Sequence, residues 1–338
     1  MTLKKKKQNS KKPEAEYAVG VDLGGTNIVL VLITYKGKVV RTERMETEAA
    51  KGPDFIIDNM AEKINGIIRS AGIKKQNVKR MGIGVPGPLD SKKGIVRLAP
   101  NMPGWKDIKL KQKIEKKTGI KTAVENDANC AVYGEKWTGA AKGAADVVGL
   151  TLGTGVGGGI ILNNRLHRGN SGTAGEIGHT IIDINGKKCS CGASGCIEAY
   201  ASATAIAESA KEKIREKRQS MIVQIAKGDM NKITSKTVYE ALLNKDKVAL
   251  EVWDDFIRHL SASLAGILNT LNPEVVVIAG GVINAGNRLF TPLRKETGKK
   301  AFAAPFSDAV IVPAKLGELA GAIGAAGAAI NEGDYYGL

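Results

Sequence analysis

The chain has 338 residues, 43% of them hydrophobic and 25% charged, which is typical of a soluble globular protein large enough for two domains. No stretch approaches the roughly 18 consecutive apolar residues that a membrane helix needs, so the sequence excludes a helical membrane protein. The formal net charge of +16 favours anionic substrates such as ATP, but it does not by itself indicate a groove-reading element for nucleic acid.

Residues 1–14 differ from the rest of the chain. Lysines are frequent there and no apolar pattern is visible, which predicts a disordered basic tail. A nucleic-acid-binding arm is the less favoured alternative. The basic start is followed by polar residues and not by the apolar core of a signal peptide. Together with cysteines expected to be reduced, this predicts a cytoplasmic protein with no nucleic-acid or membrane partner.

From residue 15 onward, apolar strand patterns alternate with helical ones, which predicts an α/β protein. In the first part we expect strands at 17–22, 28–34, 39–47, 81–85 and 122–125, and helices at 55–70, 109–118 and 127–137. In the second part we expect strands at 147–152, 159–162, 275–279 and 309–312, and helices at 203–217, 238–243, 247–271 and 319–330.

An internal repeat links the two parts. VGVDLGGTNIVLVL at 19–32 and VGLTLGTGVGGGII at 148–161 align without gaps, and each places a Gly-rich turn between two apolar strands. Such a duplication predicts two related domains that face each other across a cleft. We expect a small α/β domain of residues 15–126 plus 318–338 and a large α/β domain of residues 127–317.

The two Gly-rich turns are candidate phosphate-binding sites. Glycine lets backbone N–H groups approach phosphate oxygens. The first turn offers Gly24, Gly25, Thr26 and Asn27, preceded by Asp22, which could hold Mg²⁺ through water; the second offers Gly153, Thr154 and Gly155. Plain hairpin turns are the alternative, and no Walker loop occurs.

Three of the four cysteines fall within eight residues, at Cys189, Cys191 and Cys196, and His179 lies just upstream. Four Cys or His ligands are the usual set of a closed structural zinc site. The alternative is three buried cysteines that pack as small apolar residues, but the lysines and serines between them argue against a buried segment.

Two carboxylates bracket this segment. If zinc folds the loop back on itself, Glu176, Glu198 and the free edge of the His179 ring could face one point, where they would suit a ligand with many hydroxyl donors, such as a sugar. Solvated surface charges are the alternative.

Upstream, Asn126 and Asp127 lie between a strand and a helix. Asp127 is either a helix cap or the general base of a phosphoryl transfer.

The run LTLGTGVGGGIILNNRLHRGNSGTAGEIGH at 150–179, followed by CSCGASGCIE, resembles the signature of the ROK family of sugar kinases and sugar-responsive repressors. The resemblance implies that His179, Cys189, Cys191 and Cys196 bind zinc. It also implies that Asp127 is the catalytic base and that the sugar is bound by Gly87, Asn101, Asn126, Asp127, Glu176, His179 and Glu198.

The paired phosphate hairpins further resemble the actin, sugar kinase and heat-shock ATPase superfamily. This resemblance implies a two-domain actin-like fold with ATP and sugar in the interdomain cleft. Asp22 to Asn27 and Gly153 to Gly155 would be its two phosphate motifs, and Gly280 and Gly281 its adenosine motif. A simple strand-to-helix turn is the alternative for the last pair.

These resemblances predict an ATP-dependent hexose kinase that uses ATP, Mg²⁺ and a structural Zn²⁺. The segment APNMPGWKDIKL resembles the glucokinase branch of the family, so we expect phosphorylation of glucose at its 6-hydroxyl. An N-acetylmannosamine kinase, a fructokinase or a broad-specificity hexokinase is the alternative. A sugar-responsive regulator without a DNA-binding domain is more remote, since only 21 residues precede Asp22. ROK proteins are often dimers or tetramers, which implies a homo-oligomer.

Overall fold

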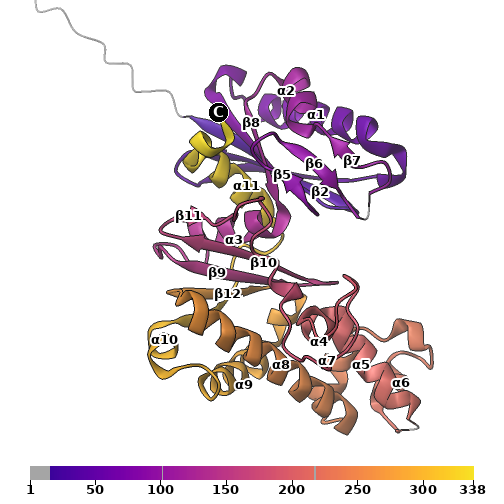
Figure 1. Cartoon of the computed structure of the whole chain (residues 1–338). Helices are drawn as coiled ribbons and strands as arrows, with labels where there is room; N and C mark the ends of the chain where they lie inside the picture. Colours follow the sequence, from indigo (N-terminus) through magenta and orange to yellow (C-terminus); the bar gives the residue numbers. More distant parts are fainter. Residues whose placement is uncertain (1–15, 101, 217) are drawn as a thin grey trace, which may run out of the picture.

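The computed structural model describes residues 16–100, 102–216 and 218–338 (Figure 1). The predicted basic tail of residues 1–14 and the predicted sugar contact Asn101 lie outside the described residues. Two five-stranded sheets form the framework, and two helices lie between them. The predicted α/β class is confirmed.

The first sheet has the strand order β3-β2-β1-β4-β8. Strand β1 runs antiparallel to β2 and parallel to β4, which is parallel to β8. The strands are β1 (Tyr17–Leu23), β2 (Asn27–Thr34), β3 (Val39–Glu46), β4 (Val78–Val85) and β8 (Thr122–Asn126). Helices α1 (Gly52–Ser70) and α2 (Leu110–Thr118) cover its outer face, because apolar residues at helical spacing, such as Ile57, Met60 and Ile64, pack into its core.

A small three-stranded sheet lies beside the first one and was not predicted. Its strands are β5 (Leu89–Asp90), β6 (Ile95–Leu98) and β7 (Lys106–Ile108). These strands have two to four residues and lie among prolines and glycines, so no periodic pattern was long enough to indicate them.

The second sheet repeats the arrangement of the first, with the order β11-β10-β9-β12-β13. Strand β9 runs antiparallel to β10 and parallel to β12, which is parallel to β13. The strands are β9 (Val147–Leu152), β10 (Val156–Leu162), β11 (Arg165–Leu166), β12 (Val275–Ala279) and β13 (Val310–Pro313). The equal strand order supports the duplication that the sequence repeat indicates.

Helices α3 (Asp127–Trp137) and α11 (Ala320–Asn331) lie between the two sheets (Figure 1). Helix α11 packs closely on β1 and β4 because both strands carry glycine at the contact. A Cβ atom on Gly20 or Gly82 would lie 1.8 Å from a backbone oxygen of α11. This close approach explains why the last helix is built almost wholly of alanine and glycine.

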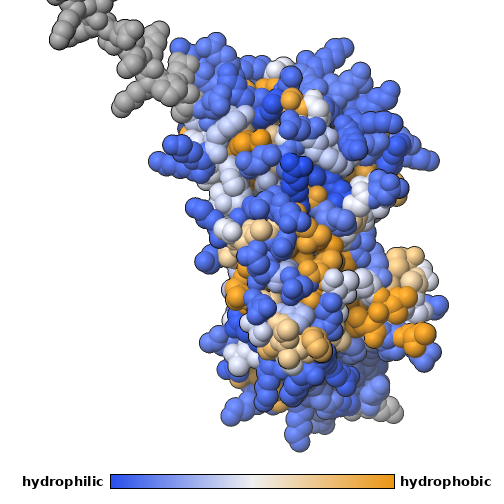
Figure 2. Space-filling model, turned by 60° about the vertical axis from the view of Figure 1, so that its left-hand side comes forward, coloured by the Kyte–Doolittle hydropathy of each residue, from blue (hydrophilic) through white to orange (hydrophobic). Residues whose placement is uncertain are grey.

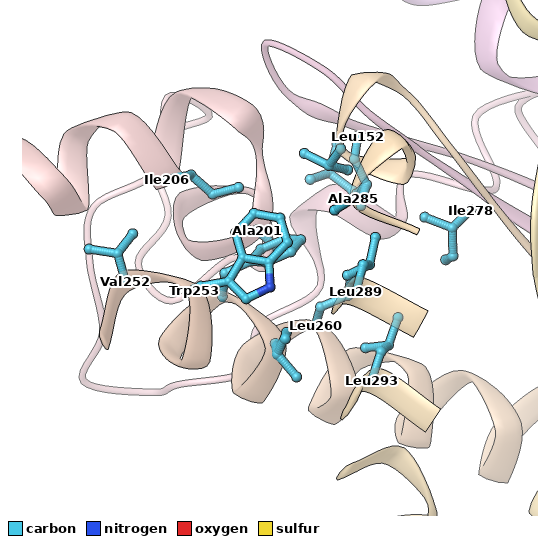
Figure 3. Packing of buried hydrophobic residues seen from close by; sticks show 14 of the residues in the cluster. Leu152, Ala201, Ile206, Val252, Trp253, Leu260, Ile278, Ala285, Leu289 and Leu293 are labelled. Carbon is cyan, nitrogen blue, oxygen red and sulfur yellow. The ribbon is translucent and has the colours of Figure 1, made fainter. Parts of the chain in front are cut away.

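A helical layer covers the other face of the second sheet. It consists of α4 (Glu198–Ala201), α5 (Ala203–Arg215), α6 (Met221–Ile225), α7 (Ser235–Leu243), α8 (Lys247–Leu271), α9 (Asn287–Gly298) and α10 (Ala303–Asp308). Figure 3 shows Leu152, Trp253 and Leu289 brought together from β9, α8 and α9 in the core beneath this sheet. In Figure 2 hydrophilic residues cover most of the visible face, and hydrophobic residues gather mainly between its upper and lower parts and on one edge below.

Some predicted boundaries were wrong. Strand β10 begins at Val156 and not at residue 159, because the glycines at 157–159 pair with β9 instead of extending the turn. Helix α9 was not predicted, and it contains Pro292, a residue type that usually kinks or breaks a helix. Within the described residues no helix is both long and apolar enough to cross a membrane. The predicted domain limits after residues 126 and 317 stay a prediction.

Candidate active site

A pocket of 420 Å³ is bounded by residues from both sheets and from the cysteine-rich segment. Such a volume is in the usual range for a small-molecule site. Ten residues that the sequence singled out line it: Gly87, Asn126, Asp127, Gly153, Thr154, Gly155, Glu176, His179, Glu198 and Gly280. Segments up to about 190 residues apart in the sequence therefore meet at one place.

Asn126 and Asp127 stand where strand β8 passes into helix α3. Asn126 is the N-cap: its Oδ1 accepts hydrogen bonds from the N–H groups of Ala128 at 2.9 Å and Asn129 at 3.1 Å. Asp127 is the first helical residue, and its Oδ1 accepts a further bond from the Ala128 N–H at 2.8 Å. Asn126 thus supplies the helix cap that was the alternative role for Asp127, and Asp127 itself lines the pocket.

Two carboxyl groups near this point have raised pKa values. Burial and, second, the Asp127 carboxylate raise the pKa of Asp22 to about 7. Burial also raises the pKa of Asp127, although hydrogen bonds from the Ala128 N–H and from Asn126 lower it. A raised pKa makes a carboxylate a better proton acceptor near neutral pH.

The predicted zinc ligands come together. His179, Cys189, Cys191 and Cys196 each place one ligand atom within 4.8 Å of the others. The Sγ of Cys189 lies 3.7 Å from His179 Nδ1, and the Sγ atoms of Cys191 and Cys196 are 3.7 Å apart. Zinc–sulfur bonds of about 2.3 Å in a tetrahedron separate the ligands by about 3.8 Å, so this donor set fits zinc.

The same loop brings the bracketing carboxylates to the pocket. Antiparallel bridges from Ile181 to Cys196 and from Lys188 to Ser194 fold the segment back on itself. Glu176 precedes the short 3-10 helix η3 (Ile177–His179), and Glu198 begins helix α4. Both glutamates and His179 line the pocket, while Nδ1 of His179 faces the cysteines.

Glu198 also holds the second Gly-rich turn. Its Oε2 accepts a hydrogen bond from the Val156 N–H at 2.9 Å, and its Oε1 accepts one from Ser190 Oγ at 3.0 Å. Gly280, at the end of β12, approaches the same turn. Its φ is 103°, and a Cβ atom there would lie 2.0 Å from the Leu152 oxygen. A larger residue at 280 would therefore displace the strand end that carries the turn.

The structure does not bring every predicted residue to this pocket. Its lining does not include Gly281 or the residues of the first turn, which are Asp22, Gly24, Gly25, Thr26 and Asn27. The Asp22 carboxyl group is nevertheless close enough to Asp127 for the charge of Asp127 to raise its pKa. The roles assigned to all these residues stay predictions.

Sequence reasoning missed other residues at this site. Thr151 and Asn129 line the pocket, as does the loop of residues 172–175. The sequence repeat could have found Thr151, because it occupies the position of Asp22 in the second copy. Ser190, which donates to Glu198, carried no signal beyond its place among the cysteines.

Comparisons with known proteins identify relatives of the chain. The model of the ROK family matches residues 18–332. The chain is 38% identical to a glucokinase of Thermotoga maritima over 91% of this chain and 95% of that protein. It is 33% identical to the xylose repressor of Bacillus subtilis over 92% of this chain and 76% of that protein. A crystal structure of a ROK family glucokinase from Streptomyces griseus in complex with glucose and AMPPNP superimposes with a TM-score of 0.76 at 34% identity, covering 92% of this chain and 98% of that one.

Proposed function

The chain belongs to the ROK family, and we propose that it is an ATP-dependent hexose kinase that transfers the γ-phosphate of ATP to the 6-hydroxyl of glucose. The observation that carries this proposal is the position of Asp127. Its carboxylate lies in one pocket with the second glycine-rich turn and with Glu176, His179 and Glu198. A proton acceptor, a phosphate-binding turn and sugar-binding groups therefore share one space, as a two-domain actin-like kinase requires.

In this mechanism the 6-hydroxyl of glucose attacks the γ-phosphorus while the Asp127 carboxylate accepts the hydroxyl proton. The bond from the γ-phosphorus to the bridging oxygen breaks, and ADP leaves. Glu176, Glu198 and His179 hold the sugar, together with Asn126, Gly87 and Asn101. The Oδ1 of Asn126 is engaged as the helix cap, so the amide group is what Asn126 offers to the sugar. Since phosphoryl transfer depends on positioning and charge, a rigid helix terminus is a suitable place for the base.

Two nucleotide-binding parts complete the proposal. The N–H groups of Gly153 to Gly155 and of Gly24 to Asn27 would bind the phosphates, and Gly280 and Gly281 would leave a flat surface for adenine. Asp22 would hold Mg²⁺, which would supply positive charge to the transferring phosphate. The cysteines and His179 would hold one Zn²⁺ in a closed set of four ligands, whose contribution is to fold the loop that carries Glu176 and Glu198.

The domains proposed above, residues 15–126 with 318–338 and residues 127–317, would close on the two substrates and exclude water from the γ-phosphate. X-ray scattering should then give a smaller radius of gyration with glucose bound, and an unchanged radius would count against closure.

We also propose a homodimer or tetramer, which sedimentation would test, and a cytoplasmic location, which cell fractionation would test.

The decisive experiment is a coupled assay of ADP release with glucose, mannose, fructose, N-acetylmannosamine and N-acetylglucosamine. The proposal predicts the highest kcat/KM with glucose. Preference for another sugar would identify a different hexose kinase of the same family. Glucose binding without ADP release would refute the kinase and favour the sugar-responsive regulator, to which the similarity with the xylose repressor also points.

A further inference from the structure

A buried ionic cluster lies behind the end of strand β8, and the mechanism above does not use it. Its centre is Arg168, whose side chain is 5% exposed. Arg168 Nε donates to Glu125 Oε2 at 2.6 Å, and its Nη1 donates to Glu332 Oε2 at 2.6 Å. Its Nη2 donates to the hydroxyl of Tyr336 at 2.5 Å, and that hydroxyl donates to Glu125 Oε2 at 2.9 Å. Arg168, Glu125 and Tyr336 therefore form a closed ring of hydrogen bonds, to which Glu332 is attached through Arg168.

The other oxygen of Glu125 reaches the turn that carries the proposed base. Glu125 Oε1 accepts hydrogen bonds from the Asn126 N–H at 2.9 Å, from Asn129 Nδ2 at 3.1 Å and from Ser91 Oγ at 3.3 Å. Asn126 and Asn129 lie on either side of Asp127 in the first turn of α3. The orientation of the Glu125 carboxylate thus sets the position of the backbone from which Asp127 projects.

The ring joins three segments that are distant in the sequence. Glu125 lies in β8 of the first sheet, and Arg168 follows β11 of the second. Glu332 ends the last helix, and Tyr336 lies in the C-terminal 3-10 helix η7 (Gly333–Tyr336), close to the label C in Figure 1. Residues 169–175 lead directly from Arg168 to the sugar-binding Glu176. The C-terminal segment therefore ties the catalytic turn to the loop that begins the sugar site.

Each charged group of the cluster makes several contacts beyond its ion pair. One guanidinium faces two carboxylates, and the Leu166 N–H donates to the second oxygen of Glu332 at 2.9 Å. The guanidinium carbon also lies 4.0 Å from the centre of the Tyr335 ring. Burial alone would lower the pKa of Arg168, but Tyr336, Glu125 and Glu332 raise it, so the group stays charged. A buried ion pair adds little net stability to a fold. We therefore look for the role of this cluster in the geometry that it imposes on its neighbours.

We propose that Arg168, Glu332 and Tyr336 are positioning residues, which hold Glu125 and through it the first turn of α3, so that the Asp127 carboxylate faces the sugar hydroxyl. This inference rests on the proposed function for the identity of the base. It extends the site to the last seven residues of the chain, none of which lines the pocket.

The test compares two variants that each remove one buried phenolic hydroxyl from the same hydrophobic cluster, Tyr336→Phe and Tyr133→Phe. Tyr336→Phe removes the donor to Glu125, whereas Tyr133 has no hydrogen bond to Glu125 or Arg168 among the described residues. For Tyr336→Phe we expect kcat to fall about 10-fold, less than the roughly 10²-fold that a misplacement of 1 Å can cause, with the KM for glucose nearly unchanged. Amide hydrogen exchange at Ala128 and Asn129 should become faster in this variant only.

Each outcome decides the question. Normal kcat and normal exchange in Tyr336→Phe would overturn the positioning role, as would equal losses in both variants. If Tyr336→Phe does not fold, Glu332→Gln is judged by the same two measurements. Wild-type protein that releases no ADP would refute the proposed function separately, and the exchange rates would still test whether Tyr336 orders the turn.

Discussion

The two glycine-rich hairpins occupy the same place in two sheets of equal strand order, yet different segments hold their turns. In the first hairpin Thr47, just after β3 of the same sheet, donates through Oγ1 to the Gly24 oxygen at 2.6 Å and through its N–H to the Thr26 oxygen at 2.9 Å. In the second hairpin the Gly153 oxygen accepts from the Ala203 N–H at 2.8 Å, and Glu198 accepts from Val156. The second turn therefore depends on the segment that follows the cysteine cluster, and the first does not.

The hairpins also differ in length and charge. Leu23 pairs with Ile28, but Leu152 pairs with Val156, so the second turn is one residue shorter and the gapless alignment of the repeat fails there. Thr151 stands in the second copy where Asp22 stands in the first. The two copies thus share a framework and differ in chemistry. The first turn follows a buried carboxylate close to Asp127, and the second turn is uncharged and bonded to Glu198.

Among changes that distinguish the two hairpins, the largest effect should come from removing the charge before the first turn. Asp22→Asn should lower kcat by roughly 10²-fold, the scale of losing one preorganised electrostatic contact to a transition state. Asp58→Asn, a matched change on helix α1, should leave kcat unchanged. Steady-state kinetics at varied Mg²⁺ would measure both variants. A normal kcat in Asp22→Asn would show that Asp22 takes no part in catalysis.

The same variant should change how the stability of the protein without bound Mg²⁺ depends on pH. The folded pKa of Asp22 is about 7 and its ordinary value is 3.8, so the free energy of unfolding should decrease as pH rises between these values. Asp22→Asn removes this dependence and should therefore melt at a higher temperature than wild type at pH 8. A lower melting temperature at pH 8 would contradict the burial of an ionised Asp22.

Loss of zinc should next affect the second hairpin and spare the first. Cys191→Ser should lose the roughly one zinc per chain expected for wild type and lower Tm by about 5 °C or more, since 1 kcal/mol corresponds to about 2–4 °C in a domain of this size. The KM for glucose should rise because Glu176 and Glu198 lose their support. Cys130→Ala, a change at a buried cysteine outside the cluster, should keep its zinc. Elemental analysis would decide, and an active, folded, metal-free Cys191→Ser protein would refute the structural zinc.

Glu198→Gln should raise the KM values for glucose and ATP by at least about 10-fold, the scale of one hydrogen bond to a charged group. The reason is that Glu198 lines the pocket and also accepts a hydrogen bond from the Val156 N–H. Glu208→Gln, in the adjacent helix α5, is the control. If only the KM for glucose changes, Glu198 does not hold the phosphate turn in solution.

The smallest effect should come from Thr47→Val, which keeps the shape of the side chain and removes the hydrogen bond to Gly24. We expect the KM for ATP to rise about 5-fold, as for one neutral hydrogen bond of about 1 kcal/mol, with the KM for glucose unchanged. Thr42→Val on the exposed face of β3 is the control. Equal changes in the two KM values would show that the first turn is not a separate phosphate site.

Sequence patterns predicted most of this framework because its long elements have clear periods. Helix α8, for example, was predicted at 247–271 from apolar residues spaced for one buried face, and it has those bounds. The cysteine cluster was also predictable, since the spacing of its ligands is local. The short strands β5 to β7 and helix α9 were not, for the reasons of length and proline given above.

The buried ionic cluster around Arg168 shows what local patterns leave out. Glu125, Arg168, Glu332 and Tyr336 come from three distant segments, and each reads in the sequence as an ordinary polar residue. Only the packing of the last helix between the two sheets brings them together. The turn length of the second hairpin was hidden for a related reason, because glycine is compatible with both a turn and a strand.

The central claim is that Asp127 is the catalytic base and lies close to both hairpins and to the segment that carries Glu176 and Glu198. The variant Asp127→Asn tests it most directly. The change keeps the shape of the side chain, and Asn126 still caps the helix, so Tm and glucose affinity should be nearly normal. The kcat for glucose-dependent ADP release should fall by at least about 10²-fold, because a positioned base contributes about 10²–10⁴-fold. A near-normal kcat in a normally folded Asp127→Asn protein would contradict the account.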